Sequence, residues 1–153
     1  MFRLTSRIVA AIIAVLMAVT MAGPALAAAA SIRVVDARLQ PGRSSVQLTV
    51  KVACDAPAGA TSYLSTTIWQ GNFLHPEAPR YLEGQGQTQI VCDGTNHAYS
   101  FTATTTVFYA DKHFRPGRAH TESVVQYCVF DPEGNGTCTP IFPLIRQRTH
   151  IHR

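Results

Sequence analysis

The chain has 153 residues, with 13 Lys and Arg against nine Asp and Glu, and a formal net charge of +4 at pH 7. Residues 1–27 hold two of the basic residues and no acid, so the remainder carries a net charge of only +2. Such a small excess argues against nucleic acid as a partner, because nucleic-acid-binding domains usually carry a strong basic stripe. The length of the remainder, about 126 residues, predicts one domain.

Residues 1–27 have the pattern of a secretory signal peptide. Two arginines precede an unbroken apolar run over residues 8–22, and Ala25-Leu26-Ala27 is the small-x-small sequence of a cleavage site. We expect cleavage after Ala27, with Ala29 as the second choice. The alternative is an uncleaved membrane anchor, but the apolar run is shorter than the roughly 20 residues that span a bilayer. We therefore expect a secreted or envelope-associated, extracytoplasmic chain with no transmembrane segment after cleavage.

Residues 28–153 alternate apolar and polar side chains with the period of two that is typical of β-strands. In chain order, we expect strands over residues 32–39, 46–54, 62–70, 87–92, 97–109, 119–130 and 139–151, the last of them interrupted or begun at Pro143. No segment keeps a helical period, and Gly and Pro turn signals recur between the strands. The sequence therefore predicts an all-β domain, a single antiparallel seven-stranded immunoglobulin-like sandwich.

Four cysteines, an even number in an exported chain, predict two disulfides. They are Cys54, Cys92, Cys128 and Cys138. In immunoglobulin-like order the strands alternate up and down, which places all four at the same end of the domain. We favour the pairs Cys54–Cys92 and Cys128–Cys138 among the three connectivities that four cysteines allow.

The same strand order separates the charges. The loops at the cysteine end contain acids and no Lys or Arg: Asp55, Asp93, Asp131 and Glu133. The opposite end has three acids, Glu77, Glu83 and Asp111, and an excess of cations: Arg43, Arg80, Lys112, Arg115, Arg118, Arg148 and Arg153. Arginine together with aromatic residues is typical of interaction hot spots. Our candidate binding residues are therefore Phe73, Arg80, Tyr81, Lys112, Phe114, Arg115 and Arg118. The alternative for the aromatic residues is that they cap the core.

No catalytic or metal-binding constellation stands out in the sequence. It has no G-x-S-x-G motif, and His150-x-His152 offers a metal ion two ligands with no visible third. Asp131-x-Glu133-x-Asn135-Gly136 resembles the start of a calcium loop, but Phe142 occupies the position of the closing acid, so we prefer a hairpin. We expect no enzymatic activity, no metal and no cofactor.

Residues Val46 to Cys128 resemble a group of small exported actinobacterial immunoglobulin-like β-sandwich proteins of unassigned function. The resemblance rests on the strand ending in Cys54, the Cys92-Asp93-Gly94 turn, and Phe114-x-Pro-Gly-x-Ala before the strand that bears Cys128. The Ala-rich leader and the bias of eleven Arg to two Lys are similar too. The resemblance implies the fold and implies no activity.

The main functional prediction is a secreted or envelope-associated binding module that uses its basic, aromatic loop end. Its expected partner is an anionic envelope component or a secreted protein. One alternative is a secreted protease inhibitor that presents the hairpin Asp131–Thr137 or the long loop over residues 71–86. A second alternative is a carrier of a small apolar ligand held between the sheets.

Overall fold

The computed structural model describes residues 31–141 and 144–153 as strands, turns and one short helix. The strands are β1 (Ser31–Leu39), β2 (Ser45–Asp55), β3 (Thr61–Gln70), β4 (Leu82–Ile90), β5 (Asp93–Thr105), β6 (Gly117–Phe130), β7 (Gly136–Pro140) and β8 (Ile145–Ile151), and the 3-10 helix is η1 (Val107–Tyr109). The expected signal peptide and its cleavage site lie outside the described residues. Within those residues, no helix combines the length and the hydropathy needed to cross a bilayer.

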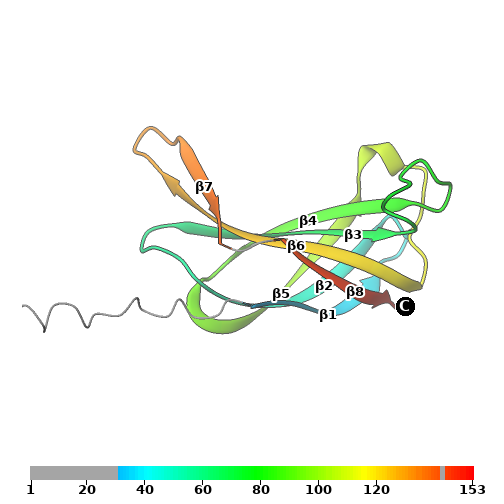
Figure 1. Ribbon diagram of the computed structural model, residues 1–153, viewed down its shortest axis with the longest axis horizontal. Coiled ribbons are helices and arrows are strands. Elements are labelled where there is room, and N and C mark those ends of the chain that lie inside the picture. Colours follow the sequence, from blue (N-terminus) through cyan, green and yellow to red (C-terminus); the bar gives the residue numbers. More distant parts are fainter. Residues whose placement is uncertain (1–30, 142–143) are drawn as a thin grey trace, which may run out of the picture.

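The strands form one continuous antiparallel sheet with the order β1-β2-β5-β4-β3-β6-β7, and β8 pairs with β6. In the expected immunoglobulin-like sandwich, β1-β2-β5-β4 and β3-β6-β8 would form two separate sheets. However, β3 pairs with β4 from Ser62 to Gln70, which joins the two groups. The all-β antiparallel prediction is confirmed, whereas the described strands do not divide into two separate sheets. The sheet instead curls until β8 approaches β1, giving a nearly closed, barrel-like shape (Figure 1).

The predicted count of seven strands is wrong because the segment 139–151 contributes to two strands. Both occupy the same edge of β6, one after the other: β7 pairs with Gln126–Phe130 and β8 with Gly117–Ser123. Pro143, where we expected an interruption, lies outside the described residues. Other boundaries also differ, most of all in β4, which begins at Leu82 rather than at 87, and in β5, which runs from Asp93 to Thr105 rather than from 97 to 109.

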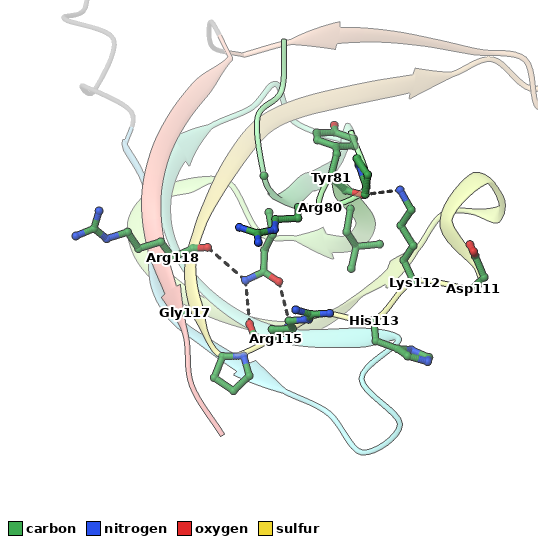
Figure 2. Close-up of a pocket in the computed structure, with 13 residues that line it drawn as sticks. Arg80, Tyr81, Asp111, Lys112, His113, Arg115, Gly117 and Arg118 are labelled. Atoms are coloured by element: carbon green, nitrogen blue, oxygen red, sulfur yellow. Dashed lines mark hydrogen bonds between the residues drawn. The ribbon is translucent and has the colours of Figure 1, made fainter. Parts of the chain in front are cut away.

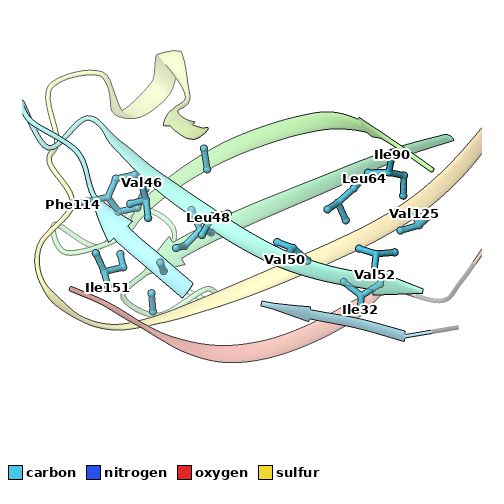
Figure 3. Close-up of a cluster of buried hydrophobic side chains, with 14 of the residues drawn as sticks. Ile32, Val46, Leu48, Val50, Val52, Leu64, Ile90, Phe114, Val125 and Ile151 are labelled. Atoms are coloured by element: carbon cyan, nitrogen blue, oxygen red, sulfur yellow. The ribbon is translucent and has the colours of Figure 1, made fainter. Parts of the chain in front are cut away.

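The core lies inside the curled sheet and is built by inward-facing residues of every strand except β7, together with Phe114 (Figure 3). On β2, Val46, Leu48, Val50 and Val52 all point inward and are fully buried, as their alternation predicts. Four hydroxyl side chains are buried with them, and two of these, Thr66 and Ser123, share a hydrogen bond of 2.9 Å between their Oγ atoms.

Gly86 allows β5 to pass close to β4. A Cβ atom at this position would lie 2.5 Å from the carbonyl oxygen of Thr102 and 3.0 Å from the Cα of Ala103. Because the blocking atoms belong to the backbone, the strands themselves would have to separate. We expect Gly86→Ala to lower the free energy of unfolding by about 1–3 kcal/mol, measured by denaturant titration. The control is Gln87→Ala, which changes an exposed residue of the same strand. Equal free energies of unfolding for the two variants would contradict this explanation.

The two predicted disulfides are present. Cys54 bonds to Cys92, and Cys128 bonds to Cys138 across the β6–β7 hairpin. Cys54 is buried against the core, while every residue of β7 is exposed. The hairpin interpretation of Asp131–Asn135 is also supported, because the Asp131 N–H donates to the Asn135 carbonyl oxygen at 2.9 Å.

A seam between β8 and β1 completes the curled sheet. At one end of the seam the backbone makes two hydrogen bonds, Leu39 N–H to His152 O (2.8 Å) and His152 N–H to Ala37 O (3.0 Å). Further along, the Gln147 side chain takes the place of a strand backbone. Its Nε2 donates to Ile32 O at 2.6 Å, and its Oε1 accepts from Val34 N–H at 2.9 Å.

Candidate functional site

Three segments that are distant in the sequence meet at the end of the sheet opposite the disulfides, which we call the basic end (Figure 1). They are the β1–β2 turn (residues 40–44), the β3–β4 loop (residues 71–81) and the segment between β5 and β6 (residues 106–116). The Phe114 N–H donates to Arg43 O at 2.8 Å, and Lys112 Nζ donates to Tyr81 O at 3.1 Å. The segregation of loops that strand alternation predicts is therefore found.

The β3–β4 loop and the β5–β6 segment enclose a pocket of about 550 Å³. Four of the predicted cations line it, namely Arg80, Lys112, Arg115 and Arg118 (Figure 2). The remaining lining residues are Gln70, Gly71, Pro79, Tyr81, Leu82, Asp111, His113, Pro116 and Gly117. The structure thus brings together cations that are 38 residues apart in the sequence at their extremes, from Arg80 to Arg118.

Gln70, at the end of β3, fixes the backbone on one side of the pocket. Its Nε2 donates to Arg115 O at 2.9 Å and to Arg118 O at 3.3 Å, and its Oε1 accepts from Arg115 N–H at 2.9 Å. These bonds hold the main chain of Arg115 and leave its guanidinium available. The Arg118 side chain points away from the pocket, toward the outer face of the sheet (Figure 2). Sequence reasoning missed Gln70, because a glutamine at a strand end carries no distinctive signal.

Among the described residues, the pocket cations have no carboxylate partner. Within residues 31–141 and 144–153, the ion pairs are His75–Glu77, His97–Asp93, Arg146–Glu122 and His152–Asp36, and none of them includes a cation of the pocket. Asp111 is the acid in the pocket lining, whereas Arg80, Lys112 and Arg115 supply three cationic side chains. An excess of one charge sign in a concave site attracts ligands of the opposite sign, so this pocket suits an anion.

None of the three aromatic candidates forms an exposed wall of the pocket, and two of them take the alternative position as caps of the core. Tyr81 and Phe114 are 1% and 0% exposed, so their rings cap the core instead of forming an exposed contact surface. The Tyr81 hydroxyl donates to Glu83 Oε2 at 2.8 Å, and burial, followed by this hydrogen bond, raises the pKa of Tyr81. Phe73 is half exposed but lies outside the pocket, with its ring 5.3 Å from that of Trp69 and the Arg146 guanidinium 5.7 Å from its centroid.

Sequence reasoning missed two exposed apolar residues at the basic end, Val107 and Phe108. The predicted strand 97–109 included both residues. In the structure, β5 ends at Thr105 and η1 presents both side chains to solvent. The run from Thr104 to Tyr109 is rich in β-branched and aromatic residues, which favour a strand on local propensity alone.

The opposite end of the sheet is acidic, and Asp93 at the start of β5 has an unusual environment. Its Oδ1 accepts hydrogen bonds from the Thr95 hydroxyl (2.7 Å), the Thr95 N–H (2.9 Å) and the His97 ring (2.9 Å). These bonds favour the charged form and lower the pKa of Asp93 to about 2, with the Thr95 hydroxyl contributing most.

We expect the Asp93 carboxyl to titrate near pH 2 in a ¹³C NMR titration. Because its folded pKa lies below the unfolded value of about 3.9, its stabilising effect is complete above that value. The effect is lost as the pH falls toward 2. Thr95→Val should raise the pKa of Asp93, while Asp131, whose pKa is lowered by Asn135, should not change. An unchanged Asp93 pKa in the variant would contradict the assigned role of the Thr95 hydroxyl.

Comparison with protein-family models and with curated protein sequences finds no match to this chain. The resemblance to actinobacterial exported proteins therefore stays a prediction, and the functional argument rests on the geometry of the basic end.

Proposed function

We propose that this chain is a secreted or envelope-associated binding module whose pocket at the basic end takes an anionic ligand. The observation that carries the proposal is the gathering of the Arg80, Lys112 and Arg115 side chains around one pocket, with no carboxylate partner among the described residues. Its volume of about 550 Å³ lies within the usual range for small-ligand sites, roughly 300–1,000 Å³. The ligand chemistry that fits is a carboxylate-, phosphate- or sulfate-bearing component of the cell envelope.

The arrangement favours binding in two ways. First, hydrogen bonds from Gln70 to Arg115 and from Lys112 to Tyr81 hold the pocket walls before a ligand arrives, which reduces the entropy lost on binding. Second, Asp55, Asp93 and Asp131 lie at the opposite end, so the molecule is electrically dipolar. Such a charge distribution orients the molecule with its pocket toward an anionic surface and speeds encounter at low salt.

Binding of the processed chain to the envelope fraction of its producer cell, measured at low and at high salt, tests the proposal. We expect binding to weaken with salt and to fall at least tenfold in Arg80→Glu/Arg115→Glu. The matched control is Arg33→Glu/Lys51→Glu, which changes the net charge equally at an exposed cross-strand pair of β1 and β2. Equal binding by the pocket variant and the wild type would overturn the proposal.

A protease inhibitor is the second candidate, and the β6–β7 hairpin favours it. This hairpin projects from the curled sheet (Figure 1), is stapled by Cys128–Cys138, and consists of exposed residues from Val129 to Pro140. Inhibitors commonly present a rigid exposed loop of this kind. Stoichiometric inhibition of a secreted serine protease, lost on reduction of the disulfide, would support this function in place of anion binding.

Export is also part of the proposal, since two disulfides are typical of oxidising, extracytoplasmic compartments. We expect a mature N-terminus at residue 28, determined by mass spectrometry of the chain recovered from the culture medium or the envelope. An intact Met1 on the exported chain would contradict this expectation.

A further inference from the structure

The most exposed apolar side chains of the described residues gather at the basic end. Leu74, Val107 and Phe108 are 80%, 85% and 86% exposed, whereas the other exposed large apolar side chains lie between 43% and 55%. Leu74 belongs to the β3–β4 loop and the other two to η1, in the segment between β5 and β6, and other residues of both segments line the pocket. Isolated exposed apolar residues are ordinary, but three of this degree beside a cluster of cations indicate an interaction surface.

Ordered contacts hold the η1 tip in place. The Tyr109 ring packs against the buried Tyr81 ring at 5.5 Å, and Lys112 Nζ lies 5.1 Å from the centroid of the Tyr109 ring. The Tyr109 N–H donates to Thr106 O at 2.9 Å, which closes the helical turn. With Tyr109 turned toward Tyr81, the short helix presents Val107 and Phe108 outward.

The β3–β4 loop is equally well defined. Gly71 closes its base with a φ of +95°, and a Cβ atom there would lie 2.7 Å from Arg80 O. At the tip, Asn72 Oδ1 accepts from Leu74 N–H at 3.1 Å, and the His75 N–H donates to Asn72 O at 3.0 Å. The Leu74 side chain is thus exposed by an ordered turn and not by a loose end.

We propose that the basic end docks on the surface of an anionic lipid bilayer, with Leu74, Val107 and Phe108 in the interface and the pocket cations on lipid headgroups. The inference rests on the proposed function, because it names the anionic component that the pocket binds. Proteins that bind at a bilayer surface combine apolar side chains, which enter the headgroup boundary, with cations that are attracted to anionic lipids. A soluble polyanion would use the cations alone and leave the three apolar side chains in water.

The charges around the tips fit this orientation. Arg43 and Arg153 lie together at the same end and, with Arg118 on the outer face of the sheet, add to the three cations of the pocket, while the acids on this side are Glu77, Glu83 and Asp111. Glu77 accepts from His75, and Glu83 accepts from Tyr81 and Gln85. The acidic end, with Asp55, Asp93 and Asp131, would face away from the bilayer.

The test is sedimentation of the processed, disulfide-bonded chain with vesicles of phosphatidylglycerol and phosphatidylcholine, compared with vesicles of phosphatidylcholine alone. NMR titration with inorganic phosphate measures anion binding at the pocket separately. Binding of soluble polyphosphate tests whether a soluble anionic polymer can replace the bilayer. Leu74→Ser/Phe108→Ser should lower affinity for the anionic vesicles at least tenfold and leave phosphate binding unchanged. Arg80→Gln/Arg115→Gln should weaken both, by about fivefold per cation on vesicles. The matched control, Val129→Ser/Phe130→Ser, removes exposed apolar side chains from the hairpin and should bind as wild type.

The outcomes separate the two proposals. Wild-type vesicle affinity in Leu74→Ser/Phe108→Ser would overturn the membrane inference, while retained phosphate binding at the pocket would keep the proposed function. Binding of polyphosphate without binding of anionic vesicles would likewise replace the bilayer by a soluble polymer. If neither phosphate, polyphosphate nor anionic vesicles bind the wild type, both proposals fail.

Discussion

Replacing both Cys54 and Cys92 with alanine is expected to lower the free energy of unfolding by about 4 kcal/mol. The bond joins the end of β2 to the connection between β4 and β5, across a separation of 38 residues. Without it, the unfolded chain gains the conformational freedom of that loop, and a buried sulfur is lost from the core. Denaturant titration of the oxidised wild type and the double variant measures the difference.

The second disulfide supplies the comparison. Cys128–Cys138 closes a separation of only 10 residues, so Cys128→Ala/Cys138→Ala should cost about 3 kcal/mol at most by the same chain-entropy argument. Cys138 is exposed on β7, and Cys128, although buried, lies outside the main core cluster, so less core packing is lost with this bond. A larger loss of stability from the hairpin pair than from Cys54/Cys92 would contradict this ranking.

Gln147→Leu is expected to lower the free energy of unfolding by about 2 kcal/mol, because it removes both hydrogen bonds of the side chain that joins β8 to β1. The Val34 N–H and the Ile32 carbonyl then lose their partners at a partly buried seam. Denaturant titration gives the stability, and hydrogen exchange of the Val34 amide should accelerate.

Gln147→Glu is the informative companion variant. The introduced carboxylate can still accept from Val34 N–H but cannot donate to Ile32 O, so the variant should be destabilised at neutral pH. Acidification protonates the introduced carboxyl group and restores a donor, so part of the lost stability should be recovered at low pH. A Gln147→Leu variant as stable as the wild type would show that the seam needs no side-chain bridge.

Much of the fold follows from alternation, and the missed features have physical reasons. Val46 to Val52 were predictable because one face of β2 is fully buried and the other is not. The start of β4 was missed because Gly84 and Gly86 weaken the strand pattern, although β5 approaches β4 so closely that Gly86 has no room for a side chain. The closure of two expected sheets into one depends on the long β3–β4 pairing, which no local pattern encodes.

The gathering of cations at the candidate site was predictable from the sequence, whereas the burial of its aromatic rings was not. Arg80, Lys112 and Arg115 share one end because alternating strands return every second loop to the same side. The main chain at Tyr81 and Phe114 is held by long-range hydrogen bonds, from Lys112 Nζ to Tyr81 O and from Phe114 N–H to Arg43 O, which no local pattern predicts. Sequence composition alone therefore could not distinguish capping rings from exposed ones.

The two ends of the molecule are stabilised in different ways. Both bonds lie at the acidic end, whereas the pocket and the apolar tips lie at the basic end. Hydrogen bonds and ring contacts, such as Tyr81 with Tyr109, hold the loops of the basic end. Variants at the pocket should accordingly change binding with little effect on the stability of the sheet.

Residue-resolved NMR mapping of the ¹⁵N-labelled processed chain, during titration with inorganic phosphate and then with anionic lipid, tests anion binding at the basic end most directly. We expect amide shifts confined to residues 70–71, 80–82, 111–115 and 117–118, joined by residues 74 and 107–108 when lipid is present. Shifts centred on the hairpin at residues 131–137, or no shifts at all, would contradict anion binding at the basic end.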